Sequence, residues 1–324
     1  MKRKGDIYKK LCSRKNIKIA FQNAQKGKGH YREVMEVNDN LEFYVSDLKY
    51  LLENKLFKTS KYIVYERKSG NKMRTIARLP YYPDRIVHHC IVQQLFKIWM
   101  NTLIRDTYAA IPGRGIHDGF KRVKQSLQDI EGTKYCLKTD IRKYFNSMDH
   151  DVMKLVNRKI IKDKDFLELL DGIIDSYEDG NPIGNYVSQW FANIYLSWFD
   201  HYCKEVLKCK YYFRYNDDVV ILDSSKKRLH GILVAMNNYY YSKLNVQMKS
   251  NYQIFPVDKR GIDFLGYRFF HKYILVRKGI VKNMKKNVGK PKSMASYWGW
   301  LKYADAYRLT NKYFKYEWII KHKA

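Results

Sequence analysis

The chain has 324 residues, of which 45% are hydrophobic, so it can bury a large core and is not a disordered basic tail. Its 62 Lys and Arg against 32 Asp and Glu leave a net charge of +30. That value is far above the roughly 2–8 that suffices for solubility, and it indicates a polyanionic partner such as nucleic acid. The start of the chain does not resemble a secretion signal, and no apolar run reaches the ~18–20 residues of a membrane span. We therefore expect a cytoplasmic protein without a membrane partner.

The aromatic residues and the cysteines give further information about the kind of protein and its binding sites. The 29 Tyr, 15 Phe and 6 Trp are interleaved with basic residues and offer faces on which bases stack, although most of these rings should pack in the core. The five cysteines form no C-x-x-C pair, which argues against a zinc site and predicts reduced thiols.

The amino-terminal part predicts helices followed by a hairpin. Residues 1–32 form a basic arm or helix pair, and Leu41–Leu56 has helical spacing. Tyr62–Arg67 and Met73–Leu79 are strand-like and are separated by polar turn residues, which predicts a hairpin. A packed helix is predicted over Asp84–Met100.

The central part predicts a second hairpin that carries acids. Lys134–Asp140 has the pattern of a short buried strand that ends in an acid, and a long helix is predicted over Ser188–Leu207. Tyr211–Tyr215 and Val219–Asp223 are apolar segments on either side of Asn216-Asp217, so we expect the acids at the tip of this hairpin.

After this hairpin the sequence predicts a helix, a strand, a third hairpin and a basic tail, over Lys227–Leu244, Val246–Phe255, Asp263–Phe270 with Tyr273–Arg277, and Arg277–Ala324. The order of the elements indicates an α+β fold in which a sheet is backed by helices and flanked by basic ends.

Three acids are candidates for a metal site. Asp140 ends a predicted strand, and Asp217 and Asp218 lie at a hairpin tip, so their carboxylates can converge. Nucleotide addition uses two divalent cations roughly 3.5–4 Å apart, and carboxylate oxygens suit Mg²⁺ or Mn²⁺. Carboxylates this close repel one another unless cations intervene. The alternative is structural, because Asn-Asp is ordinary turn chemistry and an acid at a strand end often caps a helix.

Five ordered segments carry motifs of one enzyme family. FRYNDD (residues 213–218) resembles the Tyr-x-Asp-Asp box of reverse transcriptases, and LKTDIRKYF (137–145) resembles their first catalytic-acid motif. DFLGY (263–267) is similar to the Phe-Leu-Gly turn before their thumb. RTIARLPYYPDRIV (74–87) and SYWGWLKYADAY (296–307) resemble the finger motif and thumb helix of retron and group II intron enzymes.

This resemblance implies a right-hand polymerase architecture with fingers, an antiparallel palm sheet backed by helices, and a helical thumb. We expect a basic arm and fingers with part of the palm over residues 1–130, the palm with the catalytic acids over 131–275, and a basic helical thumb over 276–324. The implied partners are dNTPs, template RNA and the RNA/cDNA duplex, and the implied cofactor is Mg²⁺ or Mn²⁺.

The segment PIGNYVSQW (residues 182–190) indicates a subfamily. Group II intron and retron enzymes usually carry Gln-Gly-x-x-x-Ser-Pro there, whereas Ile183-Gly184 and Ser188-Gln189 are similar to the diversity-generating retroelement enzymes. That subfamily makes error-prone, adenine-mutagenic cDNA from a retroelement RNA for targeted gene diversification, or mutagenic retrohoming. It works with a small, basic, oligomeric accessory variability protein, and it implies a bacterial or phage origin. Two alternatives are an accurate retron-like, group II intron-like or CRISPR-associated reverse transcriptase, and a catalytically silent RNA-binding scaffold.

The resemblance assigns roles to the acids and their neighbours. It implies Asp140 and Asp217 as principal metal ligands, Asp218 as an assisting acid, and the Ile141 carbonyl as a further ligand. Phe145 would lie under the sugar and reject ribonucleotides, with core packing as the alternative.

The basic candidates concern the triphosphate. Arg67, Lys72 and Arg74 flank the tip of the first hairpin, where antiparallel strands can turn them toward one triphosphate. A solvated basic hairpin is the alternative. Lys249 is a candidate for protonating the departing pyrophosphate.

Ile183, Gly184 and Gln189 are expected to line the templating base pair. Gly184 permits close backbone approach, and Ile183 in place of the usual Gln removes a polar contact, which is a route to misinsertion. The alternative for Ser188 and Gln189 is a helix start capped by Ser188.

Overall fold

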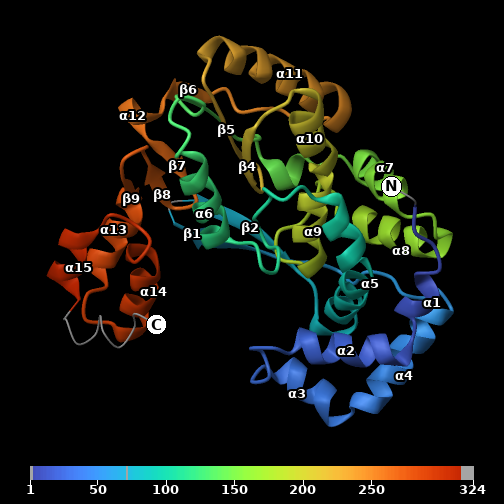
Figure 1. Cartoon of the computed structure of the whole chain (residues 1–324). Helices are drawn as coiled ribbons and strands as arrows, with labels where there is room; N and C mark the ends of the chain where they lie inside the picture. The colour runs from blue at the N-terminus through green and yellow to red at the C-terminus, as the bar shows by residue number, and fades with distance from the viewer. Residues whose placement is uncertain (1–2, 71, 315–324) are drawn as a thin grey trace. The chain divides into compact units, whose positions relative to one another are not determined.

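The computed structural model describes residues 3–70 and 72–314 (Figure 1). The chain divides into two compact units. The first comprises Met1–Arg105, Ile141–Tyr202 and Met236–Met248, and the second comprises Asp106–Asp140, Cys203–Ala235 and Lys249–Ala324. Along the described residues, no helix is both long and apolar enough to cross a bilayer.

The first unit is mostly helical. Helix α5 packs against α2 and α9, with Trp99 of α5 stacked on Trp190 of α9 at 5.5 Å between ring centroids. The apolar residues of α5 recur at helical intervals, as predicted, and are buried on several sides because neighbouring helices cover them. Its helices are α1 (Tyr8–Leu11), α2 (Arg14–Ala24), α3 (Arg32–Asp39), α4 (Leu41–Glu53), η1 (Tyr81–Arg85), α5 (Ile86–Thr102), η2 (Tyr144–Ser147), α7 (His150–Ile160), α8 (Lys164–Asp175), α9 (Tyr186–Tyr195) and α10 (Ser197–His201).

The first unit also holds the predicted hairpin. Strands β1 (Ile63–Ser69) and β2 (Lys72–Arg78) pair antiparallel, with Ser69 opposite Lys72. The hairpin has little cover: Ala77 is 1% exposed, whereas Ile63 near its base and Met73 near its tip are 60% and 57% exposed. The hairpin therefore presents most of its side chains to solvent.

The prediction of one long helix over Ser188–Leu207 is wrong. Helix α9 begins earlier, at Tyr186, so Ser188 lies inside the helix and does not cap it. The helix ends at Tyr195, and α10 (Ser197–His201) and η3 (Tyr202–Val206) follow. The Ser197 hydroxyl donates to the Ile194 carbonyl at 2.7 Å, a local bond that competes with the helical ladder at this break. Apolar residues continue on both sides of the break, so periodicity does not reveal it.

The second unit is built on a four-stranded antiparallel sheet of strand order β4-β5-β3-β6. Its strands are β4 (Tyr211–Tyr215), β5 (Asp218–Asp223), β3 (Tyr135–Thr139) and β6 (Gln253–Pro256). Strand β3 and the β4–β5 hairpin confirm the predicted elements. The predicted strand Val246–Phe255 is only partly right, because β6 begins at Gln253 and Met248 forms an isolated bridge with Ile141. The helices α6 (Ile116–Ser126), α11 (Lys226–Leu244) and α12 (Val257–Arg260) complete this part, and α11 continues into the first unit.

A three-stranded antiparallel sheet and the tail helices form the rest of the second unit. Its strands are β7 (Ile262–Phe264), β8 (Tyr267–Phe269) and β9 (Ile274–Val276), and its helices are α13 (Lys278–Lys286), α14 (Pro291–Leu301) and α15 (Tyr307–Tyr313). The predicted hairpin is present as β8 and β9, but its first segment, Asp263–Phe270, is divided into β7 and β8, because Leu265 and Gly266 have φ of 52° and 83° and form the turn that DFLGY implied. A Cβ at Gly266 would lie 2.3 Å from the Trp300 ring, so only glycine fits against α14. Residues 315–324 of the expected thumb lie outside the described residues.

The two sheets and the tail helices of the second unit share one hydrophobic core. Phe213 of β4, Phe269 of β8, and Met294 and Trp298 of α14 belong to the same buried cluster. These observations confirm an α+β fold with antiparallel sheets backed by helices.

Candidate active site

The sheet of the second unit brings the three predicted acids to one edge. Thr139, the last residue of β3, lies opposite Val219 of β5, so the end of β3 meets the start of β5. Asp140 directly follows β3, Asp218 begins β5, and Asp217 lies in the turn between β4 and β5. Residues far apart in the sequence therefore share one corner of the sheet.

The carboxyl groups of Asp140 and Asp217 interact with each other. Burial, followed by a hydrogen bond with Asp140 and the charge of Asp140, raises the pKa of Asp217 to about 7. The charge of Asp140 disfavours ionisation of Asp217, and the positive charge of Lys249 opposes this effect. A cation bound at this corner would act in the same direction as Lys249.

Positive charge also favours the ionised form of Asp218, and the cationic partner of Asp218 is Lys138. Burial raises the pKa of Asp218 to about 6, and Lys138 opposes this rise. The Lys138 ammonium lies 3.3 Å from Asp218 Oδ2. Within the part of the chain that the structure describes, Oδ1 of Asp218 and Oδ1 of Asp140 are buried and have no hydrogen-bond partner. Leaving a buried carboxylate oxygen unpaired is costly, so both atoms suit a cation.

Lys249 lies beside Asp140, and its role toward pyrophosphate stays a prediction. Its backbone N–H donates to the Asp140 carbonyl at 2.9 Å, and its ammonium forms an ion pair with Asp140 Oδ2. Lys138 was missed from the sequence. The signal was present, because Lys138 and Asp140 are two residues apart along a strand, and such residues point to the same face.

The donor set at this corner fits a hard cation in part. Its protein ligands are oxygens, as Mg²⁺ and Mn²⁺ prefer. Over residues 3–70 and 72–314, no group of three or more His, Cys, Asp or Glu side chains is arranged to hold a metal ion. Asp140 and Asp217 supply a pair, while Asp218 is tied to Lys138. The Ile141 carbonyl belongs to a residue of the first unit and stays a predicted ligand.

A buried arginine fixes the turn that carries the acids. Arg214 is fully buried, and its Nη1 donates to the Asn216 carbonyl at 2.9 Å. Asn216 has φ of 53°, a left-handed conformation that Asn adopts more readily than other non-glycine residues. The sequence did not single out Arg214, since one Arg in so basic a chain carries no signal by itself.

The predicted triphosphate residues lie on the hairpin of the first unit. Arg67 lies opposite Arg74 in the β1–β2 pair, so their side chains point to the same face of the hairpin. Lys72 lies two residues before Arg74 on β2 and therefore shares that face. All three are exposed. Their contact with a triphosphate stays a prediction.

Ile183 and Gly184 dock on the same hairpin. The Ala77 N–H of β2 donates to the Ile183 carbonyl at 2.8 Å. Gly184 has φ of 136°, and a Cβ there would lie 2.6 Å from the Ala77 carbonyl oxygen. The close approach that Gly184 permits is therefore to the backbone of β2.

Gly184 and Arg67 line a basic cavity of about 310 Å³ within the first unit. The cationic side chains that line it are Lys28, Arg67, Arg78 and Arg85. Burial, and then the charges of Arg85 and Arg78, lower the pKa of Lys28, while Glu33 opposes this shift.

Phe145 and Gln189 complete the predicted set. Phe145 lies on η2, half-buried, with its ring edge-on to Tyr144 at 5.8 Å between centroids. Gln189 lies half-buried in the first turns of α9. The acids and Lys249 belong to the second unit, and the other predicted side chains belong to the first.

The model of the family "Reverse transcriptase (RNA-dependent DNA polymerase)" matches residues 66–269. Protein YkfC of Escherichia coli (strain K12) is 24% identical over 253 residues, which are 64% of this chain and 66% of that protein. A COX1/OXI3 intron 2 protein of Saccharomyces cerevisiae is 21% identical over 246 residues, 55% of this chain and 29% of that protein. The chain thus spans just under two thirds of the first relative and under a third of the second.

Among solved structures, telomerase from Candida albicans in complex with a TWJ fragment of telomeric RNA matches with a TM-score of 0.53. The identity is 12%, and the match covers 86% of this chain and 61% of that one. This likeness concerns the fold, and it agrees with the expected right-hand polymerase architecture. Since the family model matches well over half of the chain, the protein belongs to the reverse transcriptase (RNA-dependent DNA polymerase) family.

Proposed function

We propose that the protein is an RNA-directed DNA polymerase whose catalytic acids are Asp140, Asp217 and Asp218. The observation that carries the proposal is the corner of the β4-β5-β3-β6 sheet, where carboxyl oxygens are buried and unpaired and the pKa of Asp217 is raised to about 7 by burial and Asp140. Family membership supports the same reading.

In this proposal Asp140 and Asp217 hold Mg²⁺ or Mn²⁺, with Asp218 and the Ile141 carbonyl assisting. When bound, the divalent cation supplies the charge that favours the attacking 3′-oxygen and the leaving pyrophosphate. Lys249 gives a proton to pyrophosphate in this proposal, which its ion pair with Asp140 supports.

The remaining residues bind and select the nucleotide. Arg67, Lys72 and Arg74 hold the triphosphate through charge-assisted hydrogen bonds, which the shared face of the hairpin supports. Phe145 lies under the sugar, and Ile183, Gly184 and Gln189 line the templating pair. We retain the division into fingers (1–130), palm (131–275) and thumb (276–324) as part of this proposal.

We further propose the diversity-generating subtype. The product is adenine-mutagenic cDNA copied from a retroelement RNA, and the partners are template RNA, dNTPs and a small basic accessory variability protein in the cytoplasm of a bacterium or phage host. The segment PIGNYVSQW supports this assignment, as does the net charge of +30, which suits phosphate backbones. An accurate retron-like, intron-like or CRISPR-associated enzyme is the second candidate.

Primer extension on an RNA template with Mg²⁺, followed by sequencing of the cDNA, tests both the polymerase activity and the diversity-generating subtype. Extension that needs template, primer and dNTPs supports the polymerase, and errors concentrated opposite template adenines support the subtype. Errors spread evenly over the four template bases would leave the polymerase in place and contradict the subtype. Binding of RNA with no incorporation under any metal would favour the silent scaffold.

A further inference from the structure

The loop Gly180–Asn185, which leads into α9, is bonded to two other segments of the first unit. On one side the Asn181 N–H donates to the Phe145 carbonyl at 2.7 Å. On the other side the Ile183 carbonyl accepts the Ala77 N–H of β2 at 2.8 Å. The loop that carries the proposed pairing residues is therefore in direct contact with the proposed sugar residue.

The Asn181 side chain extends this connection to α9. Asn181 is 6% exposed, and its Nδ2 donates to the Ser188 carbonyl at 2.8 Å. Ser188 precedes Gln189 in the chain. One buried residue thus joins Phe145 through its backbone and the start of α9 through its side chain, and a buried amide holds such bonds firmly because breaking them leaves polar atoms unpaired.

Two glycines make these contacts close. Gly180 has φ of 64°, and a Cβ there would lie 2.5 Å from the Phe145 carbonyl oxygen. Gly184 is equally tight against β2, with 2.6 Å from such a Cβ to the Ala77 carbonyl oxygen. The loop is therefore confined by backbone on both sides.

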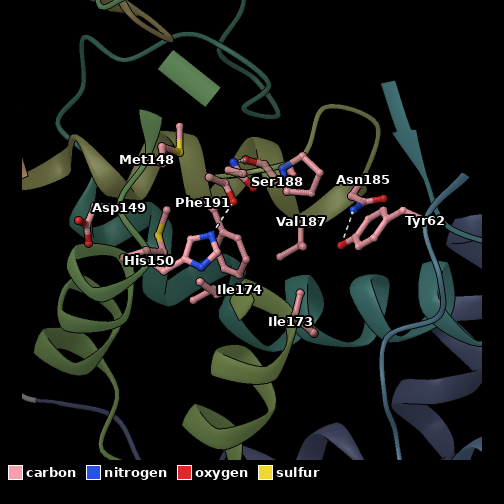
Figure 2. A pocket seen from close by; sticks show the side chains of 14 residues that line it. Tyr62, Met148, Asp149, His150, Ile173, Ile174, Asn185, Val187, Ser188 and Phe191 are labelled. Carbon is pink, nitrogen blue, oxygen red and sulfur yellow. Dashed lines mark hydrogen bonds between the residues drawn. The ribbon is translucent and has the colours of Figure 1, made fainter. Parts of the chain in front are cut away.

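The side chains beneath the loop Gly180–Asn185 are closely packed as well. Asn185 Nδ2 lies 3.3 Å from the Tyr62 hydroxyl, which lies 2.9 Å from the Ser176 hydroxyl. Figure 2 shows apolar side chains such as Val187 and Phe191 filling the space below. The cavity that is left measures about 10 Å³, roughly the space of one water, so the loop has little room to relax.

We propose that Asn181 is a positioning residue that determines substrate selectivity, because it joins Phe145 to the loop of Ile183 and Gly184. The inference rests on the proposed polymerase function and deepens it. Removing the Asn181 side chain shifts sugar selection and base selection together, although Asn181 itself contacts neither substrate group.

The test compares Asn181→Ala with a matched control, Asn157→Ala. Asn157 is a fully buried asparagine of the same unit, and its Nδ2 donates at 3.0 Å to Met153 O within its own helix. Both changes delete one buried amide-to-carbonyl bond, and Asn181→Ala keeps the backbone N–H that binds Phe145. The readouts are kcat/KM for the correct dNTP, a mispaired dNTP and the matching rNTP, together with Tm.

We expect Asn181→Ala to lower discrimination against both the mispaired dNTP and the rNTP by roughly three- to tenfold, the scale of one lost hydrogen bond. Asn157→Ala is expected to lower Tm and leave both ratios as in the wild type. Unchanged ratios in Asn181→Ala, or equal losses in Asn157→Ala, would overturn the inference.

Tyr62→Phe keeps the test decisive if Asn181→Ala does not fold. It removes only the hydroxyl that contacts Asn185 and Ser176, and we expect a change of roughly twofold in both ratios in the same direction. Wild-type ratios in Tyr62→Phe would then overturn the inference. A wild-type protein that extends no primer would contradict the proposed function and this inference with it, whereas an active wild type whose variants keep its ratios contradicts the inference alone.

Discussion

Arg67 and Arg74 lie directly opposite each other across the β1–β2 hairpin, and both side chains are exposed. Two like charges at opposed positions of an antiparallel pair destabilise it. Such a pair is favourable when an anion lies between the guanidinium groups, since each Arg can form two parallel hydrogen bonds with a phosphate. The register therefore favours a phosphate site on this face of the hairpin.

Arg74→Ala is expected to raise KM for dNTPs by roughly tenfold or more, because a charge-assisted hydrogen bond contributes about 1.5–3 kcal/mol. We expect kcat to change less, since the bond is made to the ground state as well. Steady-state primer extension measures both constants. The matched control is Lys68→Ala, which removes a charge from the opposite face, where Lys68 pairs with Met73. Equal rises of KM in the two variants would contradict a specific phosphate site.

Asn216 is expected to resist replacement by alanine. Asn216→Ala places a residue with a Cβ and no polar side chain at φ of 53°, which costs about 1 kcal/mol of unfolding free energy. Asn216→Gly should be close to neutral, because glycine adopts this conformation without strain. Chemical denaturation of both variants measures the difference. An alanine variant as stable as the glycine variant would refute the strain argument.

His88 and His89 on α5 predict a loss of stability in acid. Burial, with the charge of Arg85, lowers the pKa of each to about 3 from the usual 6.5. The unfolded chain therefore binds more protons than the folded one between these values, so their contribution is fully present above pH 6.5 and is lost as the pH falls toward 3. We expect each histidine to remove about 3 kcal/mol by about pH 4.

Urea denaturation at several pH values measures this slope, and His88→Leu should flatten it. A control at an exposed histidine is His30→Leu, which should leave the slope as in the wild type. A wild-type protein whose stability is constant from pH 7 to pH 4 would contradict burial of neutral imidazoles.

The sequence was informative where a local pattern decides the structure. The β1–β2 and β4–β5 hairpins could be predicted because polar turn residues separate two apolar or β-prone segments, and Asp140 could be placed because it ends a short apolar strand. The meeting of Asp140 with the β4–β5 tip was implied by the order of family motifs, and the antiparallel pairing of β3 with β5 provides its physical reason.

The parts that could not be predicted depend on contacts between distant residues. The helix break at Leu196 lies within a run of apolar residues and leaves no periodic signal, whereas the turn at Leu265-Gly266 was implied by the likeness of DFLGY to the Phe-Leu-Gly turn. The partner of Lys138, Asp218, is brought to it by the pairing of β3 with β5, and the role of Arg214 depends on its burial, although its partner Asn216 is two residues away. Asn181 had no signal, because its partners, Phe145 and Ser188, are defined by the course of the loop.

The central claim is that Asp140 and Asp217 share a metal-dependent catalytic corner, and template-dependent dNTP incorporation with Mg²⁺ tests it most directly. The comparison is between wild type, Asp217→Asn and Asp258→Asn, the last being an acid of the same unit that pairs with His271. We predict that Asp217→Asn loses about a thousandfold in rate, corresponding to about 4 kcal/mol, while Asp258→Asn keeps the wild-type rate. Incorporation by Asp217→Asn at the wild-type rate, with both variants folded by Tm, would contradict the account.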